Sequence, residues 1–230
     1  MIQTATSSPG TDQAGPGSPR RQARSQATRT ALLDAALHEF AAHGFEAAST
    51  RAIAARAGTH QPQINYHFAS KQELWLAAVE HLFLRLDEAI ARHLPEGVEQ
   101  GFGPGVTRSS LAAGIRSFVR AVAELPELNR IMVQEATTGS DRLSTIVEQY
   151  TRPRYELLAD NWRTLRERGD VPDIDETVFY YSLIGAASLP YVNSPEAHLL
   201  GVDTTTDAFV EAHADALILM FLGPDDGSDS

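Results

Sequence analysis

Apolar residues in the first third of the chain recur at helical spacing, and turn signals interrupt them at short intervals. The pattern predicts a first helix over roughly residues 26–43, which ends at Gly44 because glycine readily adopts the left-handed conformation that closes a helix. Ser49 is the expected N-cap of a second helix of about two turns, which ends at Gly58. The inward-facing positions of these two helices are Leu32, Leu33, Ala36, Leu37, Phe40, Ala41, Ile53, Ala54 and Ala57.

A third short helix is expected immediately after Gly58. Thr59 can cap it and Pro62 fits its first turn, where a missing backbone N–H does no harm. Ile64 and Phe68 are four residues apart and are its expected buried anchors. Two short helices joined by a glycine-bearing turn predict a helix-turn-helix.

A longer fourth helix is predicted next. Ser70 and Glu73 fit a capping box at its start, and it is expected to end before Pro95. Its apolar positions are Leu74, Leu76, Val79, Leu82, Phe83 and Leu86.

The third helix carries more polar residues than its own packing requires. Five of them have no core to fill, namely Gln61, Gln63, Asn65, Tyr66 and His67. Amide side chains can hydrogen-bond base edges in the major groove, whereas Tyr66 and the ammonium of Lys71 suit phosphate oxygens. Thr50 and Arg51 open the second helix, whose N-terminal amides form a natural phosphate site. We interpret this set as a DNA-reading surface; the alternative is a solvated polar face on a small helical hairpin.

Five short motifs follow one another within residues 29–84. They are Gly44-Phe45, Ser49-Thr50-Arg51-Ala52-Ile53-Ala54, Ala57-Gly58, Tyr66-His67-Phe68 and Ser70-Lys71. In this order they resemble the DNA-binding domain of the TetR family of bacterial transcriptional regulators. The resemblance implies DNA-facing positions at Thr50, Arg51, Gln61, Pro62, Gln63, Tyr66, His67 and Lys71. The family most often has Tyr where this chain has Asn65, so Asn65 reads a base, touches phosphate through water, or does neither.

Charge is divided unevenly along the chain. The net charge is −11, but residues 1–71 hold seven Lys/Arg and four Asp/Glu, a net +3, and residues 72–230 hold twelve and twenty-six, a net −14. A basic head on an acidic body would turn the head toward DNA and repel the rest. The alternative for the body is that an acidic surface simply maintains solubility. The chain has no Cys, which excludes disulfides, thiolate metal sites and a cysteine nucleophile.

The first 24 residues are rich in Ser, Gly, Pro, Ala and Gln, and a segment of this composition is expected to form a disordered arm. Arg20, Arg21 and Arg24 could bring such an arm into a minor groove or onto phosphate, or the arm could be inert. The arm lacks the apolar core of a secretory signal, and no later stretch reaches the roughly 18 apolar residues of a membrane span. We therefore expect a soluble, cytoplasmic protein.

The rest of the chain predicts further helices and no strand. A glycine-rich loop precedes an amphipathic face, and another helix is expected from Pro126 to Gly139. Pro153 is expected to kink a long segment over residues 140–168, because proline removes a helical donor and crowds the preceding turn. The amphipathic face comprises Leu111, Ile115, Phe118, Val119 and Val122.

Two long helices are expected at the C-terminal end. Asp173 and Glu176 fit a second capping box for the first of them, and the other is expected at about residues 205–222. Their apolar positions are Val178, Tyr181, Ile184, Ala187 and Leu189, and then Phe209, His213, Ala216, Leu217, Met220 and Phe221. The fold predicted is all-α, with a three-helix helix-turn-helix head on a C-terminal helical bundle.

The expected domain organisation follows from these elements. Residues 1–24 are the disordered arm, 25–71 the DNA-binding domain, 72–94 a connecting helix, 95–222 the effector-binding and dimerisation domain, and 223–230 a flexible tail.

The last two long helices suggest a homodimer interface. Gly185, Ala186, Ala187 and Ser188 are small enough for a neighbouring helix to approach closely, and the final helix has a wide apolar stripe. Two such helices from each chain could form a four-helix interface, which the resemblance also implies; alternatively both pack within one subunit. A two-fold dimer would match a pseudo-palindromic operator in double-stranded DNA, with half-sites about 34–36 Å apart or a multiple of that.

The resemblance further implies a small-molecule effector, bound in the helical body, that releases DNA. Candidate ligand contacts are Phe118, Asn129, Met132, Glu135, Tyr155, Trp162 and Tyr181, each of which could equally be core or surface. The ligand is unknown from the sequence, and no cofactor or metal is expected.

Two other classes of protein are the alternatives, an all-helical enzyme and a nonspecific architectural DNA-binding protein. An all-helical enzyme finds little support, because His38 and His43 are five residues apart, about 140° around a helix, whereas a zinc-protease helix needs four. A nonspecific architectural DNA-binding protein should be broadly basic, which this chain is not. We therefore predict a sequence-specific transcriptional regulator that is not an enzyme, most simply a repressor released by its ligand.

Overall fold

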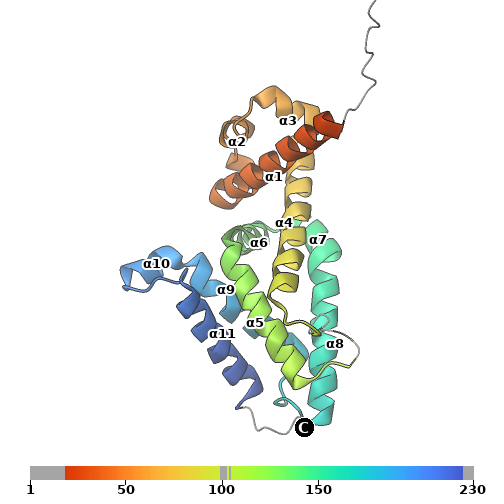
Figure 1. The fold of residues 1–230 in the computed structure, drawn as a ribbon, viewed down its shortest axis with the longest axis vertical. Coiled ribbons are helices and arrows are strands. Elements are labelled where there is room, and N and C mark those ends of the chain that lie inside the picture. Colours follow the sequence, from red (N-terminus) through yellow and green to blue (C-terminus); the bar gives the residue numbers. More distant parts are fainter. Residues whose placement is uncertain (1–18, 99–102, 104, 225–230) are drawn as a thin grey trace, which may run out of the picture.

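The computed structural model describes residues 19–98, 103 and 105–224, and every regular element within these ranges is helical (Figure 1). The elements are α1 (Pro19–Ala47), α2 (Thr50–Arg56), α3 (Gln61–His67), α4 (Lys71–His93), α5 (Arg108–Glu124), α6 (Pro126–Thr138), α7 (Asp141–Ile146), the π-helical η1 (Val147–Thr151), α8 (Arg152–Arg168), α9 (Glu176–Val192), α10 (Ser194–Leu199) and α11 (Asp207–Leu222). The predicted all-α fold with an N-terminal helix-turn-helix is confirmed.

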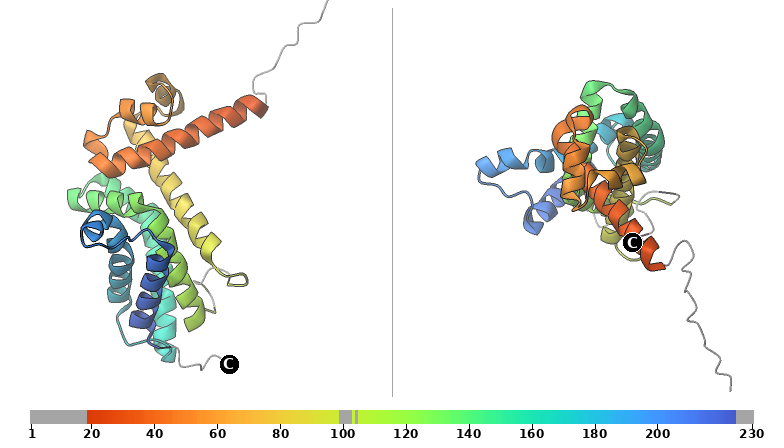
Figure 2. Two further views of the ribbon diagram at one scale, coloured as in Figure 1. Left: turned by 60° about the vertical axis from the view of Figure 1, so that its left-hand side comes forward. Right: turned by 90° about the horizontal axis from the view of Figure 1, so that it is seen from above.

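Helices α1, α2 and α3 form a small head at one end of the molecule, and α4 runs from it into the body (Figures 1 and 2). The interior of the head forms where α1 buries one apolar face against α2 and α4. Leu32, Phe40 and Ile53 are fully or almost fully buried there, together with Leu74 and Trp75 of α4. The expected anchors of the head are therefore in its interior, and Trp75 adds a large buried side chain.

Helix α1 begins earlier than the sequence pattern indicated. It starts at Pro19 rather than near residue 26, so residues 19–24, which were expected to belong to a disordered arm, are helical. Proline is tolerated in the first turn of a helix, and the Arg, Gln and Ala residues that follow it are favourable helix formers. Residues 1–18 lie outside the described part of the chain.

The caps of the head agree with the sequence in two of three cases. Ser49 caps α2 and accepts a hydrogen bond from the Ala52 amide, and the Ser70 hydroxyl accepts one from the Glu73 amide at 3.0 Å. The Glu73 carboxylate accepts from the amide of Ala69, one residue before the cap. Thr59 was wrong as the cap of α3: its N-cap is His60, which makes no side-chain capping bond. Pro62, whose φ is fixed by its ring, stands in the first turn of this short helix.

The body is a bundle in which α5 packs against both α4 and α11. Its core is centred on Trp162 of α8 and Phe179 of α9, whose rings stack with centroids 3.7 Å apart. The Trp162 indole N–H donates to the carbonyl of Ile174 at 2.8 Å, so the buried ring leaves no polar group unpaired.

The long segment after Gly139 is interrupted where proline was expected to disturb it. The helix passes through the π-helical turn η1 immediately before Pro153, and the Arg152 amide donates to the carbonyl of Val147, five residues back. Proline offers no N–H to the preceding turn, and the wider turn accommodates this loss.

Helix α9 is capped by Asp175, not by Asp173 as the sequence suggested. The Asp175 carboxylate accepts hydrogen bonds from the amides of Thr177 and Val178, whereas the Asp173 side chain is almost completely exposed. Both acids stand near the helix start, and backbone geometry rather than residue type decides between them.

Helices α9 and α11 are apolar on two faces. One face of each is buried within the subunit, including Ala187 and Ser188, two of the small residues expected at a dimer interface. The other face is exposed and carries Val178, Tyr181, Gly185 and Leu189 on α9 and Ala216, Leu219 and Met220 on α11.

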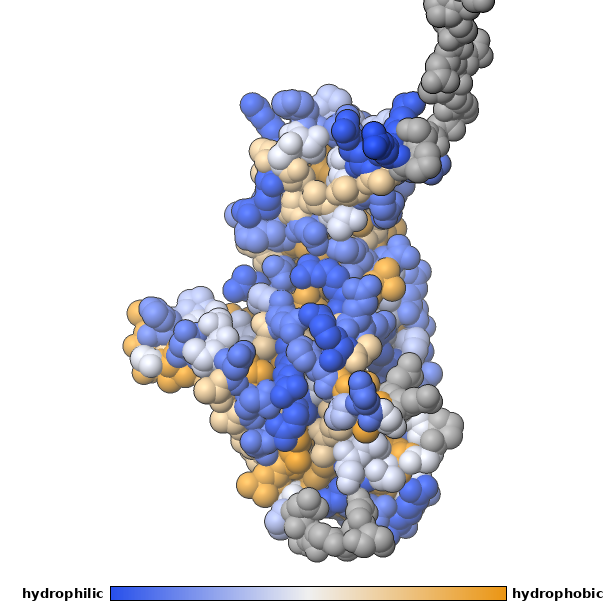
Figure 3. Space-filling model, viewed as in Figure 1, coloured by the Kyte–Doolittle hydropathy of each residue, from blue (hydrophilic) through white to orange (hydrophobic). Residues whose placement is uncertain are grey.

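Helix α10 projects from the body beside this exposed face (Figures 1 and 2). Leu199 and Leu200 at its end are 87% and 77% exposed. Hydrophobic residues gather over α10 and the lower end of α11 in the space-filling view (Figure 3). None of the described helices is long and apolar enough to cross a membrane.

Candidate DNA-binding interface

The two short helices of the head are held at a fixed angle by a few buried side chains. Ile53 of α2, Ile64 of α3 and Phe68 directly after α3 are each no more than 2% exposed. Gly58 has φ of +66° and makes the turn between the helices, a conformation that other residues rarely adopt. The polar residues of α3 are thus carried on a rigid base.

Helix α3 turns its remaining side chains outward. Gln61, Pro62, Gln63, Asn65 and Tyr66 are all exposed, and Tyr66 is 72% exposed. The surface expected from the sequence therefore exists as a continuous exposed strip, and no part of it is folded into the body.

His67 is half-buried, and its ring contacts that of Tyr66, with the two ring centroids 4.9 Å apart. Burial, and in second place the nearby guanidinium of Arg29, lower the pKa of His67 below its usual value. Near neutral pH this imidazole is therefore uncharged and can donate or accept a single hydrogen bond at each nitrogen.

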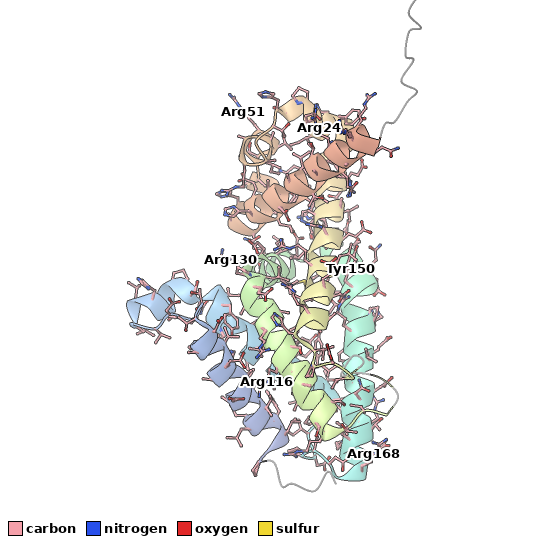
Figure 4. The ribbon with its side chains drawn as sticks, in the orientation of Figure 1. Arg24, Arg51, Arg116, Arg130, Tyr150 and Arg168 are labelled. Atoms are coloured by element: carbon pink, nitrogen blue, oxygen red, sulfur yellow. The ribbon has the colours of Figure 1, made fainter. Side chains whose placement is uncertain are left out.

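The start of α2 lies beside the start of α3. The Gln61 amide donates to the Thr50 hydroxyl at 3.4 Å, and Arg51 is exposed on the outer end of the head, as is Arg24 of α1 (Figure 4). Arg20 and Arg21 are also exposed on α1, so these arginines are presented by a helix rather than by a flexible arm. Exposed guanidinium groups of α1 and α2 thus lie on the same head as the amide-bearing strip.

The backbone at the start of α2 is fixed by a buried carboxylate. Glu39 of α1 is 8% exposed, and it accepts a hydrogen bond from the Ser49 amide at 3.1 Å. This bond ties the N-terminus of α2 to α1, and the sequence pattern gave no sign of it.

Lys71, at the first position of α4, is half-buried and already held. Its ammonium donates to the carbonyl of Glu46 at 3.1 Å and lies 4.9 Å from the centroid of the Phe45 ring. An ammonium has three donors, so others remain available to a phosphate oxygen.

The head is fastened to α4 by a charged cluster that sequence reasoning missed. Asp34 of α1 lies 2.9 Å from the His81 imidazole and 3.4 Å from the Arg85 guanidinium, both on α4. A groove of about 630 Å³ lies along this junction and is also lined by His38, Arg56 and Glu127. These contacts fix how α1 crosses α4, and the distance of 47 residues between Asp34 and His81 explains why no local pattern revealed them.

The seven candidate effector contacts differ in burial and in the partners that they already have. Tyr181 is 70% exposed, Trp162 is fully buried against Phe179, and Glu135 is buried and accepts hydrogen bonds from Ser140 and Arg142. Glu135 and Trp162 thus already have hydrogen-bond partners within the body, as a buried carboxylate and a buried indole require.

The other candidates keep groups that a ligand could engage. Phe118 and Met132 are half-buried, and Tyr155 donates to or accepts from the Thr177 hydroxyl at 2.8 Å. Asn129 is 8% exposed and its amide nitrogen has no hydrogen-bond partner. An unpaired buried donor carries a desolvation cost, which a bound acceptor would relieve.

Within the described residues, no group of three acidic or histidine side chains is arranged to hold a metal ion. His43 lies 4.0 Å from Glu39, whose buried carboxylate serves the Ser49 amide.

Residues 32–78 match the family model described as bacterial regulatory proteins, tetR family. A TetR family transcription regulator from Marinobacter aquaeolei VT8 has a similar structure, with a TM-score of 0.60 and 20% identity over 87% of this chain and 98% of that one. A TetR-like transcriptional regulator from Rhodococcus sp. RHA1 gives a TM-score of 0.60 and 24% identity over 84% and 92%.

AibR in complex with isovaleryl coenzyme A and operator DNA gives a TM-score of 0.61 and 17% identity over 86% of this chain and 100% of that one. These likenesses show that the fold extends over the body as well as the head. None of the curated proteins matches the chain.

Proposed function

We propose that this chain is a regulator of the tetR family, and that it acts as a homodimeric, sequence-specific repressor which a small ligand releases from a pseudo-palindromic operator. The observation that carries the proposal is the exposed strip on α3, from Gln61 to Tyr66, on a base of fully buried anchors. A rigid helix with outward amides is what base reading in the major groove requires.

Base reading is assigned to the amides of α3, and contact with the DNA backbone to hydroxyl and cationic groups of the head. Gln61, Gln63 and Asn65 have the donors and acceptors that match base edges. The phosphate contacts are assigned to Thr50, Arg51, Tyr66 and Lys71, with Pro62 and His67 packing against the duplex.

The exposed apolar face of α9 and α11 supports a two-fold dimer. Monomeric proteins rarely leave a contiguous apolar surface in water, and here Tyr181, Leu189 and Met220 are each more than half exposed. Two copies of this face would form a four-helix interface, and Leu199 and Leu200 on α10 would extend it. The dimer would place the two α3 helices for successive major grooves.

The helical body is the proposed site of the effector. Asn129, with its unpaired buried amide, and the half-buried Phe118, Met132 and Tyr155 offer a polar contact and an apolar lining. The ligand would act by binding one head separation more tightly than the other, since only a difference in affinity shifts such an equilibrium.

Selection of bound sites from a pool of random duplexes tests the proposal. The full chain should enrich a sequence with two-fold symmetry, and a panel of small metabolites should contain one that reduces retention of that sequence. Enrichment of no sequence, or of sites without symmetry, would contradict the proposed dimeric regulator.

A further inference from the structure

The corner between α6 and α7 touches the head at the turn where α1 ends. Helix α6 lies directly beneath the C-terminal end of α1 (Figures 1 and 2), and the Gln134 amide donates to the carbonyl of Ala41 at 3.0 Å. Gly44, with φ of +73°, interrupts α1 at this point and exposes the ring of Phe45 to the body. The body therefore contacts the head at the point where Gly44 interrupts α1, and not along an unbroken stretch of that helix.

Arg142 occupies the middle of this contact. Its guanidinium carbon lies 4.0 Å from the centroid of the Phe45 ring and 5.8 Å from that of Trp75, and its side chain is 15% exposed. A guanidinium stacked over an aromatic face in a partly desolvated place is a favourable arrangement.

Arg142 is in turn anchored by the body. Its guanidinium lies 3.1 Å from the carboxylate of Glu135, whose side chain is only 4% exposed and also accepts a hydrogen bond from Ser140 at 2.5 Å. The other carboxylate near it belongs to Glu46 on the head, at 3.7 Å. One cation thus bridges a buried anion of the body and an exposed anion of the head.

Lys71 contacts the same two residues of the head, Phe45 and Glu46. The Lys71 ammonium lies over the Phe45 ring and donates to the Glu46 carbonyl. A continuous line of contacts therefore runs from Glu135 in the body, through Arg142 and Phe45, to a lysine at the expected DNA surface. We propose that Arg142 is a positioning residue for DNA binding, which sets the place of the Lys71 ammonium according to the position of the α6–α7 corner.

This inference rests on the proposed function, because it takes Lys71 as a phosphate contact. The body would act on that phosphate contact through the line of contacts from Glu135 through Arg142 and Phe45. A movement of α6 relative to α1 displaces Arg142 from Phe45. The Glu46 carbonyl, which accepts the hydrogen bond of Lys71, directly follows Phe45 in the chain and moves with it.

A double-mutant cycle on the full chain tests it. We expect Arg142→Ala to weaken binding to the selected duplex about tenfold, equivalent to about 1.4 kcal/mol, and to flatten the salt dependence as Lys71→Ala does. In a Lys71→Ala background the same change should have almost no further effect. Arg142→Lys keeps the charge but not the planar stacking, and should give an intermediate loss.

Arg152→Ala is the matched control, since Arg152 is exposed and pairs with Glu148, four residues earlier in the body, instead of with a residue of the head. It should leave both affinity and salt slope unchanged. Additive losses for Arg142→Ala and Lys71→Ala, or a loss with an unchanged salt slope, would overturn the inference. Should Arg142→Ala not fold, the Arg142→Lys cycle decides on the same criteria. Failure of the unmodified chain to prefer any duplex would instead refute the proposed function.

Discussion

At the level of single residues, Gln63 of α3 and Lys71 of α4 represent two kinds of DNA contact. Gln63 is exposed in the middle of the helix, where a side chain can reach into a groove, whereas Lys71 is held at the edge of the head by Glu46 and Phe45. A base contact carries sequence information and a phosphate contact does not, so substitutions at the two positions should have different signatures.

Gln63→Ala should relax base preference. The loss should be about 1–3 kcal/mol on the selected operator, with little loss on sites already altered at the contacted base pair, because the missing amide no longer discriminates there. Dissociation constants on the operator and on its single-base variants measure this. An equal loss on every sequence would contradict a base-reading role.

Lys71→Ala should weaken binding to all duplexes by a similar factor. The slope of log affinity against log salt should fall by about one unit, because one phosphate contact and its released counterion are lost. Titrations at several salt concentrations measure the slope. A loss of affinity for the operator alone would contradict the phosphate role of Lys71 and indicate that this residue reads bases.

His213 on α11 should make stability depend on pH. Burial lowers its pKa below the usual 6.5, while a backbone hydrogen bond with Ala186 acts in the other direction. The Tyr191 hydroxyl lies 3.0 Å from its Nδ1, and burial raises the pKa of Tyr191 to about 12, so this phenol stays protonated as a donor.

The stability falls on acidification because His213 binds a proton more readily in the unfolded chain than in the folded one. The stability due to neutral His213 is complete above pH 6.5 and is lost as the pH falls from there toward the lowered pKa. The free energy of unfolding should therefore decline less on acidification in His213→Gln than in the unmodified chain. Parallel declines would show that His213 does not titrate in this way.

The residues that sequence reasoning placed correctly are those governed by local pattern. Ile64 and Phe68 had to be buried because they are the apolar positions of a short polar helix, and their burial leaves Gln61, Gln63 and Asn65 outside. Arg142 could not be found in this way, since its partners are Phe45 and Trp75, which lie far from it in the sequence.

At the level of elements, a single capping residue determines where α2 begins. The Ser49 hydroxyl accepts from the Ala52 amide at 3.3 Å, satisfying one of the free donors at the helix start. Ser49→Ala should lower the free energy of unfolding by about 1 kcal/mol in urea denaturation. Ser144→Ala, at an exposed serine within α7, is the control and should cause no loss, because alanine is the more favourable residue inside a helix.

Helix α11 has an exposed apolar face besides its buried one, and a substitution on the exposed face is expected to impair dimer formation. Met220 is 67% exposed on the face proposed for the dimer, and Met220→Asp would bring two like charges together across the two-fold axis. The dimer dissociation constant should rise roughly thirtyfold or more, about 2 kcal/mol, as measured by sedimentation.

Leu157→Asp is the control for this prediction, because Leu157 is also exposed but lies on α8. It should leave the association unchanged. A Met220→Asp chain that remains dimeric would show that another surface joins the subunits.

Element types could be predicted from periodicity, but their ends could not always be. The start of α1 at Pro19 depends on favourable helix formers that carry no apolar pattern, and so the expected start lay within the helix. The choice of Asp175 over Asp173 depends on the path of the backbone before α9, which residue type does not reveal. Pro153, by contrast, acts through its own missing donor, and the disturbance was expected where η1 occurs.

At the level of the whole molecule, the head and the exposed face of α9 and α11 lie on different parts of an elongated structure (Figures 1 and 2). This separation allows one end to contact DNA while the body pairs with a second copy. The uneven charge of the chain, net +3 over residues 1–71 and net −14 over residues 72–230, favours the same orientation on a polyanion.

The central claim is that the exposed strip of α3 reads a particular sequence. Competition binding measures it most directly: the affinity of the full chain for its selected operator is compared with that for random duplex of equal length at one salt concentration. We predict a preference of roughly 10³-fold or more for the operator. Equal affinity for both duplexes, or no binding to either at low ionic strength, would contradict it.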